Sequence, residues 1–299
     1  MTAPRLRRVD AHLHLWDLTG GGYRWVTPDL GALHASFTPE DAAAVLRDGG
    51  MDAVVLVQAD DTLADTQAML DVASAHPWVA GVVGWVDLEH PDRAEQQLDR
   101  WQSDAVFCGV RHLVHTDPRP DFLDRPGVRR SLALLAERGL PLDVPDAWPR
   151  HLRQVRDVVS GTPGLRVVVD HLGKPPDDPA ELGPWRAQLA EVAALPGTVA
   201  KVSGLQHLHH GRSWDDGAEG SVRPVWETAL ELFGPDRLMY GGDWPMTVPA
   251  GGDEPARAVA ERLVGELAPG EQARVWAGTA VEVYRLGTPA AGGAPVTDL

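Results

Sequence analysis

Short runs of apolar residues recur along the chain at fairly even spacing. They have the length and the β-branched content of strands, and they are apolar on both faces, which is typical of buried parallel strands. The eight segments cover residues 9–14, 53–58, 79–86, 106–112, 140–144, 165–171, 199–203 and 238–243. The pattern therefore predicts a parallel β-structure that is covered on both sides.

Amphipathic patterns separate these runs and carry helix-end signals. Residues 38–41 (T-P-E-D) combine an N-cap residue, proline at the first helical position and early acids, and Gly49-Gly50 ends that segment. Further helices are predicted over 125–138, 182–194, 222–233 and 271–286. Strand–helix alternation repeated eight times predicts the α/β class and a (β/α)₈ barrel. The alternative is a doubly wound open sheet, but the first strand-to-helix turn lacks a glycine-rich phosphate loop.

The 299 residues accommodate one such barrel, which needs about 250. We expect an N-terminal extension over 1–8, a single barrel domain over 9–286 and a flexible tail over 287–299, where small and polar residues dominate. Two long connections, 17–37 and 204–221, are predicted to cover the mouth of the barrel.

Charge and composition narrow the range of partners. A formal net charge of −16 argues against nucleic acid and against an anionic membrane surface, and no apolar run is long enough for a transmembrane helix. Cys108 is the single cysteine, so no intrachain disulfide is expected and a cytoplasmic location is the simplest one. A small molecule is the expected partner, and the oligomeric state stays open.

Histidine, arginine and aspartate gather where the predicted strands end. Active sites of such barrels lie at these carboxyl ends, and His12 and His14, two residues apart on a strand, point to the same face. With His171 and Asp243 they offer three imidazoles and a carboxylate. This set suits one Zn²⁺ ion, and it equally suits metal-free hydrolysis with Asp243 as general base and a histidine as carbonyl polariser.

Other polar residues at strand ends have two interpretations each. Arg111 is either an anion clamp or a structural ion-pair partner, and Lys174 either neutralises substrate or is a solvated loop lysine. Lys201 is expected to form a buried ion pair or to act in the site, and Asp143 to pair with a cation or couple to Asp243. No G-x-S-x-G elbow and no P-loop occurs, so a serine nucleophile is not expected.

Seven motifs occur in order along the chain: 9–16 (VDAHLHLW), 55–59 (VLVQA), 81–88 (GVVGWVDL), 109–112 (GVRH), 170–175 (DHLGKP), 201–205 (KVSGL) and 241–245 (GGDWP). The ordered set resembles the amidohydrolase superfamily of the amidohydrolase 2 type, in its sugar-lactonase branch with L-fuconolactonases, L-rhamnonolactonases and 2-pyrone-4,6-dicarboxylate lactonases. The resemblance covers about residues 8–286.

The resemblance implies a barrel that hydrolyses a lactone to a hydroxy acid. Its catalytic residues fall on Asp243, which activates water, and on His171, His12 and His14, which polarise the carbonyl or bind a metal ion. The fifth strand offers neither a histidine nor a lysine placed for carbamylation, so we expect no cofactor or one divalent ion, with Zn²⁺ the best candidate. We expect substrate contacts from the following side chains: Arg111, Gln58, Lys174, Trp85 and Trp16.

The expected substrate is a sugar-acid 1,4-lactone similar to L-fuconolactone. Two other functions stay open: a metal-dependent decarboxylase or amide hydrolase of the same superfamily, and a non-catalytic barrel that binds a sugar acid or a protein. Two positions depart from the family's pattern, because Gly242 stands where serine is common and Thr279 where asparagine is common.

Overall fold

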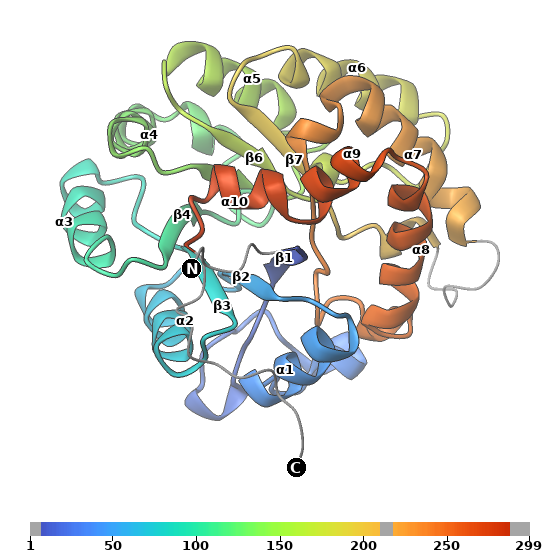
Figure 1. Cartoon of the computed structure of the whole chain (residues 1–299). Helices are drawn as coiled ribbons and strands as arrows, with labels where there is room; N and C mark the ends of the chain where they lie inside the picture. The colour runs from blue at the N-terminus through green and yellow to red at the C-terminus, as the bar shows by residue number, and fades with distance from the viewer. Residues whose placement is uncertain (1–6, 210–217, 288–299) are drawn as a thin grey trace, which may run out of the picture.

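Eight parallel strands lie in one sheet and follow one another in chain order (Figure 1). The structure is a computed structural model, and it describes residues 7–209 and 218–287. The strands are β1 Val9–Leu13, β2 Ala53–Val57, β3 Val79–Gly84, β4 Phe107–Arg111, β5 Leu142–Val144, β6 Val167–Val169, β7 Thr198–Val202 and β8 Leu238–Tyr240. Each lies inside or overlaps its predicted segment. The predicted site residues His14, His171 and Asp243 follow their strands in loops, whereas His12 and Arg111 lie within β1 and β4.

The sheet closes on itself just beyond the ends of β1 and β8. Leu13 forms a parallel bridge with Trp244, the backbone N–H of His14 donates to the Trp244 carbonyl at 2.8 Å, and that of Asp243 donates to the His12 carbonyl at 2.7 Å. These hydrogen bonds confirm the (β/α)₈ barrel. They also bring the first and last motifs of the chain together.

Most helices surround the barrel, and the last two lie across one end of it (Figure 1). They are α1 Pro39–Asp48, α2 Leu63–Ala75, α3 Pro91–Trp101, α4 Pro126–Arg138, α5 Leu152–Gly161, α6 Leu182–Ala193, α7 Ala218–Phe233, α8 Asp253–Gly265, α9 Pro269–Ala273 and α10 Thr279–Val283. The helix predicted over 271–286 is confirmed up to Val283, but it is not one regular α-helix, because a π-helical turn, Arg274–Gly278, lies between α9 and α10. Val275, Trp276 and Ala277 are all buried in this turn, which a regular helix with one apolar face does not achieve.

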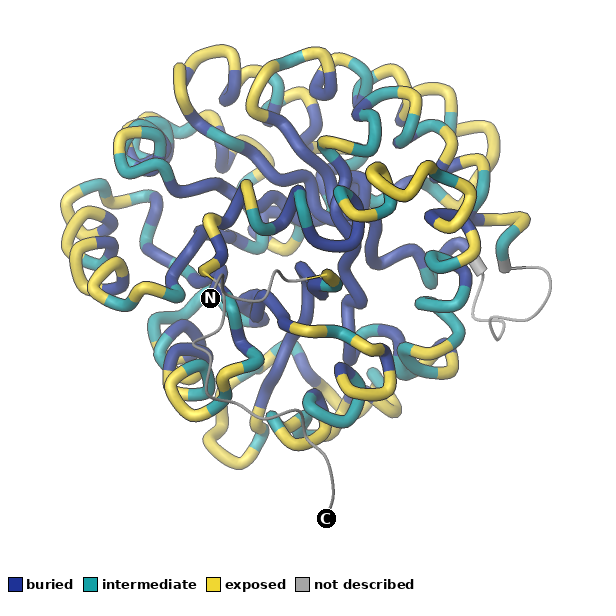
Figure 2. The backbone as a smooth tube through the Cα atoms, in the orientation of Figure 1, coloured by how far each residue is buried: buried dark blue, intermediate teal, exposed yellow. Residues whose placement is uncertain are grey.

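Two apolar layers explain why the strands are apolar on both faces. Val54 and Leu56 pack outward against the helices, whereas Val55 and Val57 point into the barrel, where α10 and the π-helical turn add Ala277, Ala280 and Val283. Figure 2 shows the strands as the most buried part of the chain. The C-terminal segment therefore completes the interior core of the barrel.

The first predicted mouth segment, 17–37, folds back on itself. Trp16 forms an antiparallel bridge with Phe37, and its indole N–H donates to the Ala35 carbonyl at 2.7 Å. Two 3₁₀ turns, Leu18–Gly20 and Pro28–Leu33, shape the segment. Residues 210–217 of the second predicted mouth segment, and residues 288–299 of the predicted flexible tail, lie outside the described residues.

Across the described residues, no helix has the length and apolar character needed to cross a bilayer. Cys108 is buried and unpaired by disulfide, as expected.

Thr38 caps α1 through a reciprocal pair of hydrogen bonds. Its hydroxyl accepts from the Asp41 N–H at 3.3 Å, and the Asp41 carboxylate accepts from the Thr38 N–H at 2.9 Å. We expect Thr38→Ala to lower the free energy of unfolding by about 1 kcal/mol, because one N–H of the first turn loses its acceptor. Thr38→Ser keeps the hydroxyl and serves as the control in urea unfolding. An Ala variant as stable as the Ser variant would contradict the contribution of this cap.

Candidate active site

A cavity of about 430 Å³ opens at the carboxyl ends of the strands. It is lined by His14, Arg24, Trp25, Ala59, Asp60, Asp61, Arg111, Leu113, His115, Thr116, Asp146, His171, Lys174, Gln206, Asp243 and Met246. Its charged side chains are of both signs, so a neutral polar ligand meets hydrogen-bond partners without a dominant charge.

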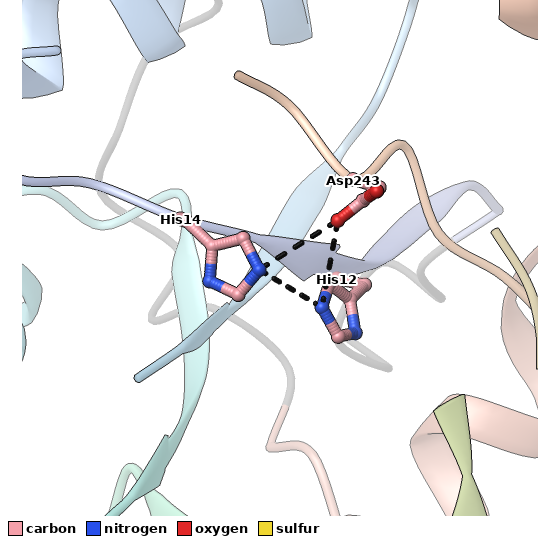
Figure 3. Close-up of side chains that lie close together, drawn as sticks. All are labelled: His12, His14 and Asp243. Atoms are coloured by element: carbon pink, nitrogen blue, oxygen red, sulfur yellow. Dashed lines mark hydrogen bonds and ion pairs between the residues drawn. The ribbon is translucent and has the colours of Figure 1, made fainter. Parts of the chain in front are cut away.

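Three imidazoles converge on one carboxylate oxygen at the base of this cavity. Asp243 Oδ1 lies 3.8 Å from His12 Nε2, 3.6 Å from His14 Nε2 and 3.9 Å from His171 Nε2. The Nε2 atoms of His12 and His14 are 3.1 Å apart. In Figure 3 the Nε2 atoms of His12 and His14 both point toward Asp243. All four predicted catalytic residues are therefore brought together.

The backbone is strained where it delivers two of these side chains. His171 has φ 54° and Asp243 has φ 55°, in the left-handed region that residues other than glycine rarely adopt. The Asp243 N–H is held by the His12 carbonyl, and the Leu172 carbonyl after His171 accepts from the Trp185 indole at 3.0 Å. These contacts aim the side chains back across the mouth instead of along the strand direction.

Hydrogen bonds from neighbouring strands orient the cluster from behind. His14 Nδ1 donates to the Val57 carbonyl at 2.8 Å, His171 Nδ1 lies 2.9 Å from Ser203 Oγ, and the Gln206 amide donates to Asp243 Oδ2 at 2.9 Å. Because Asp243 Oδ2 accepts the hydrogen bond from Gln206, the other oxygen, Oδ1, faces the three histidines.

Burial and charge set the protonation of the cluster. Burial by itself would raise the pKa of Asp243, but its interactions with His171, His14 and His12, a hydrogen bond with His14 among them, outweigh burial and lower that pKa below its ordinary value. Burial lowers the pKa of His171 and of His12. Asp243 is therefore ionised at neutral pH, the form in which it can accept a proton from water.

The donor set also fits a single divalent ion. A tetrahedral ion with bonds of about 2.0–2.1 Å to nitrogen and oxygen holds its ligand atoms roughly 3.4 Å apart. The separations among His12, His14 and Asp243 are 3.1, 3.6 and 3.8 Å, and these three form one of the metal-competent groups among the described residues. His171 is close enough to complete the set.

A buried ion network lies beneath His12. Lys201 donates to Asp143 Oδ2 at 2.7 Å and lies 3.1 Å from Asp170 Oδ1, and Arg111 pairs with Asp170 Oδ2 at 3.1 Å. Tyr284 donates to Asp143 at 2.6 Å. Burial would lower the pKa of Lys201, but Asp143 and Asp170 raise it overall, so this side chain is an ammonium. The predicted pairing of Lys201 with a strand carboxylate is confirmed, and Asp143 pairs with it and not with Asp243.

The residues predicted to contact substrate are divided between the cavity and its surroundings. Arg111 and Lys174 line the cavity. Gln58 is buried behind it, where its amide donates to Asp61 at 3.0 Å. Trp85 donates to His112 at 3.1 Å, and Trp16 lines a neighbouring cavity behind the 17–37 segment. Contact of all five with substrate stays a prediction.

Sequence reasoning missed several residues of the cavity wall. Arg24 and Trp25 come from the first mouth segment, His115 from the loop after β4, and Asp146 from the loop after β5. Gln206 follows β7 and holds Asp243. Arg24, Trp25 and Gln206 lie in the two segments predicted to cover the mouth, so their region was expected but not the individual residues. For His115 and Asp146 the signal was their position shortly after a predicted strand.

Gly204 leaves room for the ring of His171. Its φ is +61°, and a Cβ atom there would lie 2.3 Å from His171 Nδ1. We expect Gly204→Ala to displace this ring, to lower kcat at least about 10-fold and to lower the free energy of unfolding by about 1–3 kcal/mol. Gly164→Ala is the matched control, because Gly164 has φ +85° and nothing within 4 Å. Equal activity of the two variants would contradict the steric role of Gly204.

Comparison with known proteins agrees with this geometry. A family model described as amidohydrolase matches residues 9–286. An L-fucono-1,5-lactonase of Burkholderia ambifaria is 32% identical over 293 residues, covering 94% of this chain and 97% of that protein. An L-fucono-1,5-lactonase of Burkholderia multivorans is 33% identical, covering 95% and 97%. A crystal structure of an amidohydrolase from Burkholderia multivorans with bound Zn has a TM-score of 0.85 at 30% identity, covering 94% and 99%.

The matched region runs from β1 through α10, and it includes every residue of the cluster around Asp243. The resemblance stated from the motifs is thereby confirmed, and the chain belongs to the amidohydrolase family.

Proposed function

We propose that the protein hydrolyses a sugar-acid lactone to the open hydroxy acid, with Asp243 as the base. One observation carries the proposal: an ionised carboxylate oxygen faces three imidazoles at the base of a cavity open to a small molecule. The two relatives named L-fucono-1,5-lactonase, at 32% and 33% identity, support this reaction. A decarboxylase or amide hydrolase, and a binding protein without catalysis, have no comparable support.

The reaction follows from the groups at the cavity base. Asp243 takes a proton from a water molecule as the water oxygen attacks the lactone carbonyl carbon. The negative charge that develops on the carbonyl oxygen is stabilised by ring N–H groups of the histidine cluster. When the tetrahedral intermediate collapses, the ring C–O bond breaks, and Asp243 returns the proton to the departing alkoxide. The sum is lactone plus water giving the hydroxy acid.

A divalent ion, with Zn²⁺ the best candidate, would be held by His12, His14, His171 and Asp243. When bound, it would supply Lewis-acid polarisation and a more acidic water. The Zn bound in the structure of the Burkholderia multivorans amidohydrolase supports this assignment.

The cavity wall supports a neutral polyhydroxylated ring as substrate. Arg24, Arg111 and Lys174 face a wall that also contains Asp60, Asp61 and Asp146, and Lys174 is 3.7 Å from Asp146. A substrate with its own carboxylate would meet these acids, whereas hydroxyl groups can pair with both signs. The names of the relatives point to a 1,5-lactone, and the sequence-based expectation is a 1,4-lactone, so ring size is a matter for assay.

One screen tests the proposal. Purified protein is assayed with a pH indicator against 1,4- and 1,5-lactones of fuconic, rhamnonic and galactonic acids, and its metal content is measured on the same sample. We expect turnover of at least one neutral sugar lactone and none of a lactone that carries a free carboxylate. Absence of turnover across the panel, with and without added Zn²⁺, would overturn the proposal.

A cytoplasmic location, supported by the single cysteine, belongs to the same proposal.

A further inference from the structure

His12 stands between two sets of partners. Its Nε2 atom points toward His14 and Asp243, 3.1 Å from His14 Nε2, and its Nδ1 atom faces the buried ion network, 3.1 Å from Lys201 Nζ and 3.4 Å from Asp170 Oδ1. A neutral imidazole carries one hydrogen, on one of these two nitrogens. The partners decide which nitrogen carries it.

The partner on the buried side is a donor. An ammonium group has hydrogens to give and no lone pair to accept with, so His12 Nδ1 must accept the hydrogen bond from Lys201. Asp170 Oδ1 is the competing acceptor for a hydrogen on Nδ1. It lies farther away and has no hydrogen bond of normal geometry. Because Nδ1 accepts from Lys201, the hydrogen of the neutral His12 ring lies on Nε2.

The partner on the cavity side leads independently to the same arrangement. His14 Nδ1 donates to the Val57 carbonyl, which can only accept, so in a neutral His14 ring the Nε2 atom has a free lone pair. The contact of 3.1 Å between the two Nε2 atoms is then a hydrogen bond from His12 to His14. One proton arrangement satisfies Lys201, His12, His14 and Val57 together.

We propose that Lys201 is a positioning residue that holds His12 in the Nε2–H tautomer, making it a hydrogen-bond donor in the metal-free site and weakening metal binding. Coordination by Nε2 requires the opposite tautomer, with the hydrogen on Nδ1 and donated to Asp170, the arrangement in which carboxylates orient metal-bound histidines. Lys201 and a metal ion thus compete for the tautomer of His12. The inference concerns the site of the proposed function but does not depend on its substrate.

The charges of the network allow a balanced variant. Lys201 and Asp143 form one pair, and Arg111 and Asp170 the other. The double variant Lys201→Met/Asp143→Asn removes one charge of each sign and keeps Arg111 with Asp170. The single variant Asp143→Asn keeps the hydrogen bond from Lys201 to His12 and is the matched control.

Two measurements without substrate test the proposal. Long-range ¹H–¹⁵N correlation spectra of metal-free protein report which nitrogen of His12 carries the hydrogen, with the signal assigned by its loss in His12→Asn. Competition with a chromophoric chelator gives the Zn²⁺ affinity. We expect Nε2–H in the wild type and in Asp143→Asn. In the double variant we expect Nδ1–H and Zn²⁺ affinity higher by about tenfold or more, the lower end of the range for residues that orient metal ligands.

The wild-type spectrum alone can overturn the inference, since Nδ1–H on His12 would show that Lys201 does not set the tautomer. Unchanged or weaker Zn²⁺ affinity in a folded double variant would overturn the link to metal binding. Neither result bears on lactone turnover, so failure of this inference and failure of the proposed function are distinguishable.

Discussion

Asp243→Asn is expected to lower kcat for lactone hydrolysis by at least about 10². The amide has nearly the same size, so the hydrogen bond of Oδ2 with Gln206 and the packing around the histidines can persist. What disappears is the anionic oxygen that lies 3.6–3.9 Å from three imidazole nitrogens. Without it the attacking water loses the anionic proton acceptor of the proposed reaction, and the neighbouring imidazoles carry no negative charge to replace it.

Initial rates on the substrate found in the screen, at saturating concentration, measure this effect. Asp236→Asn is the control, because Asp236 is exposed and pairs with Arg274 on the surface. Circular dichroism establishes that both variants are folded. An Asn variant with near wild-type kcat would remove Asp243 from the role of base and would direct attention to Zn²⁺-activated water.

Lys201→Met is expected to lower the free energy of unfolding by about 3–5 kcal/mol, the usual cost of removing one partner from a buried ion pair. Lys201 is fully buried, and its loss leaves Asp143 and Asp170 with Arg111 as the sole cation of the network. Methionine fills a similar volume, so the loss reflects uncompensated charge and not a cavity. Urea unfolding at neutral pH measures it.

The double variant Lys201→Met/Asp143→Asn supplies the matched comparison. We expect it to recover part of the lost stability, because it removes the carboxylate that the single variant leaves without its cation. Burial already raises the pKa of Asp143 to about 6, and loss of Lys201 raises it further. The folded single variant then binds a proton that the unfolded chain releases, so its deficit should shrink as the pH falls below neutral. A deficit that grows on acidification would contradict this explanation.

Much of the barrel could be predicted because its signals are local. The apolar residues of β2, Val54 to Val57, pack alternately into the layer under the helices and into the barrel interior. A run that is apolar on both faces therefore predicts a strand buried on both sides. The cap at Thr38 and Asp41 is likewise complete within four residues. The turn Arg274–Gly278 was not predictable in this way, because its π geometry is set by packing under the barrel and not by its own propensity.

In the site, too, some features could be predicted from local sequence and others could not. The sequence by itself determined which residues form the chemical cluster, because His12, His14, His171 and Asp243 lie at or shortly after the carboxyl end of an apolar strand, and the parallel strands of a barrel end on one face. Only the tertiary structure decided the partners of each group. The Gly242 N–H donates to Asp10, which is 232 residues away in the chain. Lys201 contacts both Asp143 and His12. These contacts depend on distances across a closed sheet, which no local sequence pattern encodes.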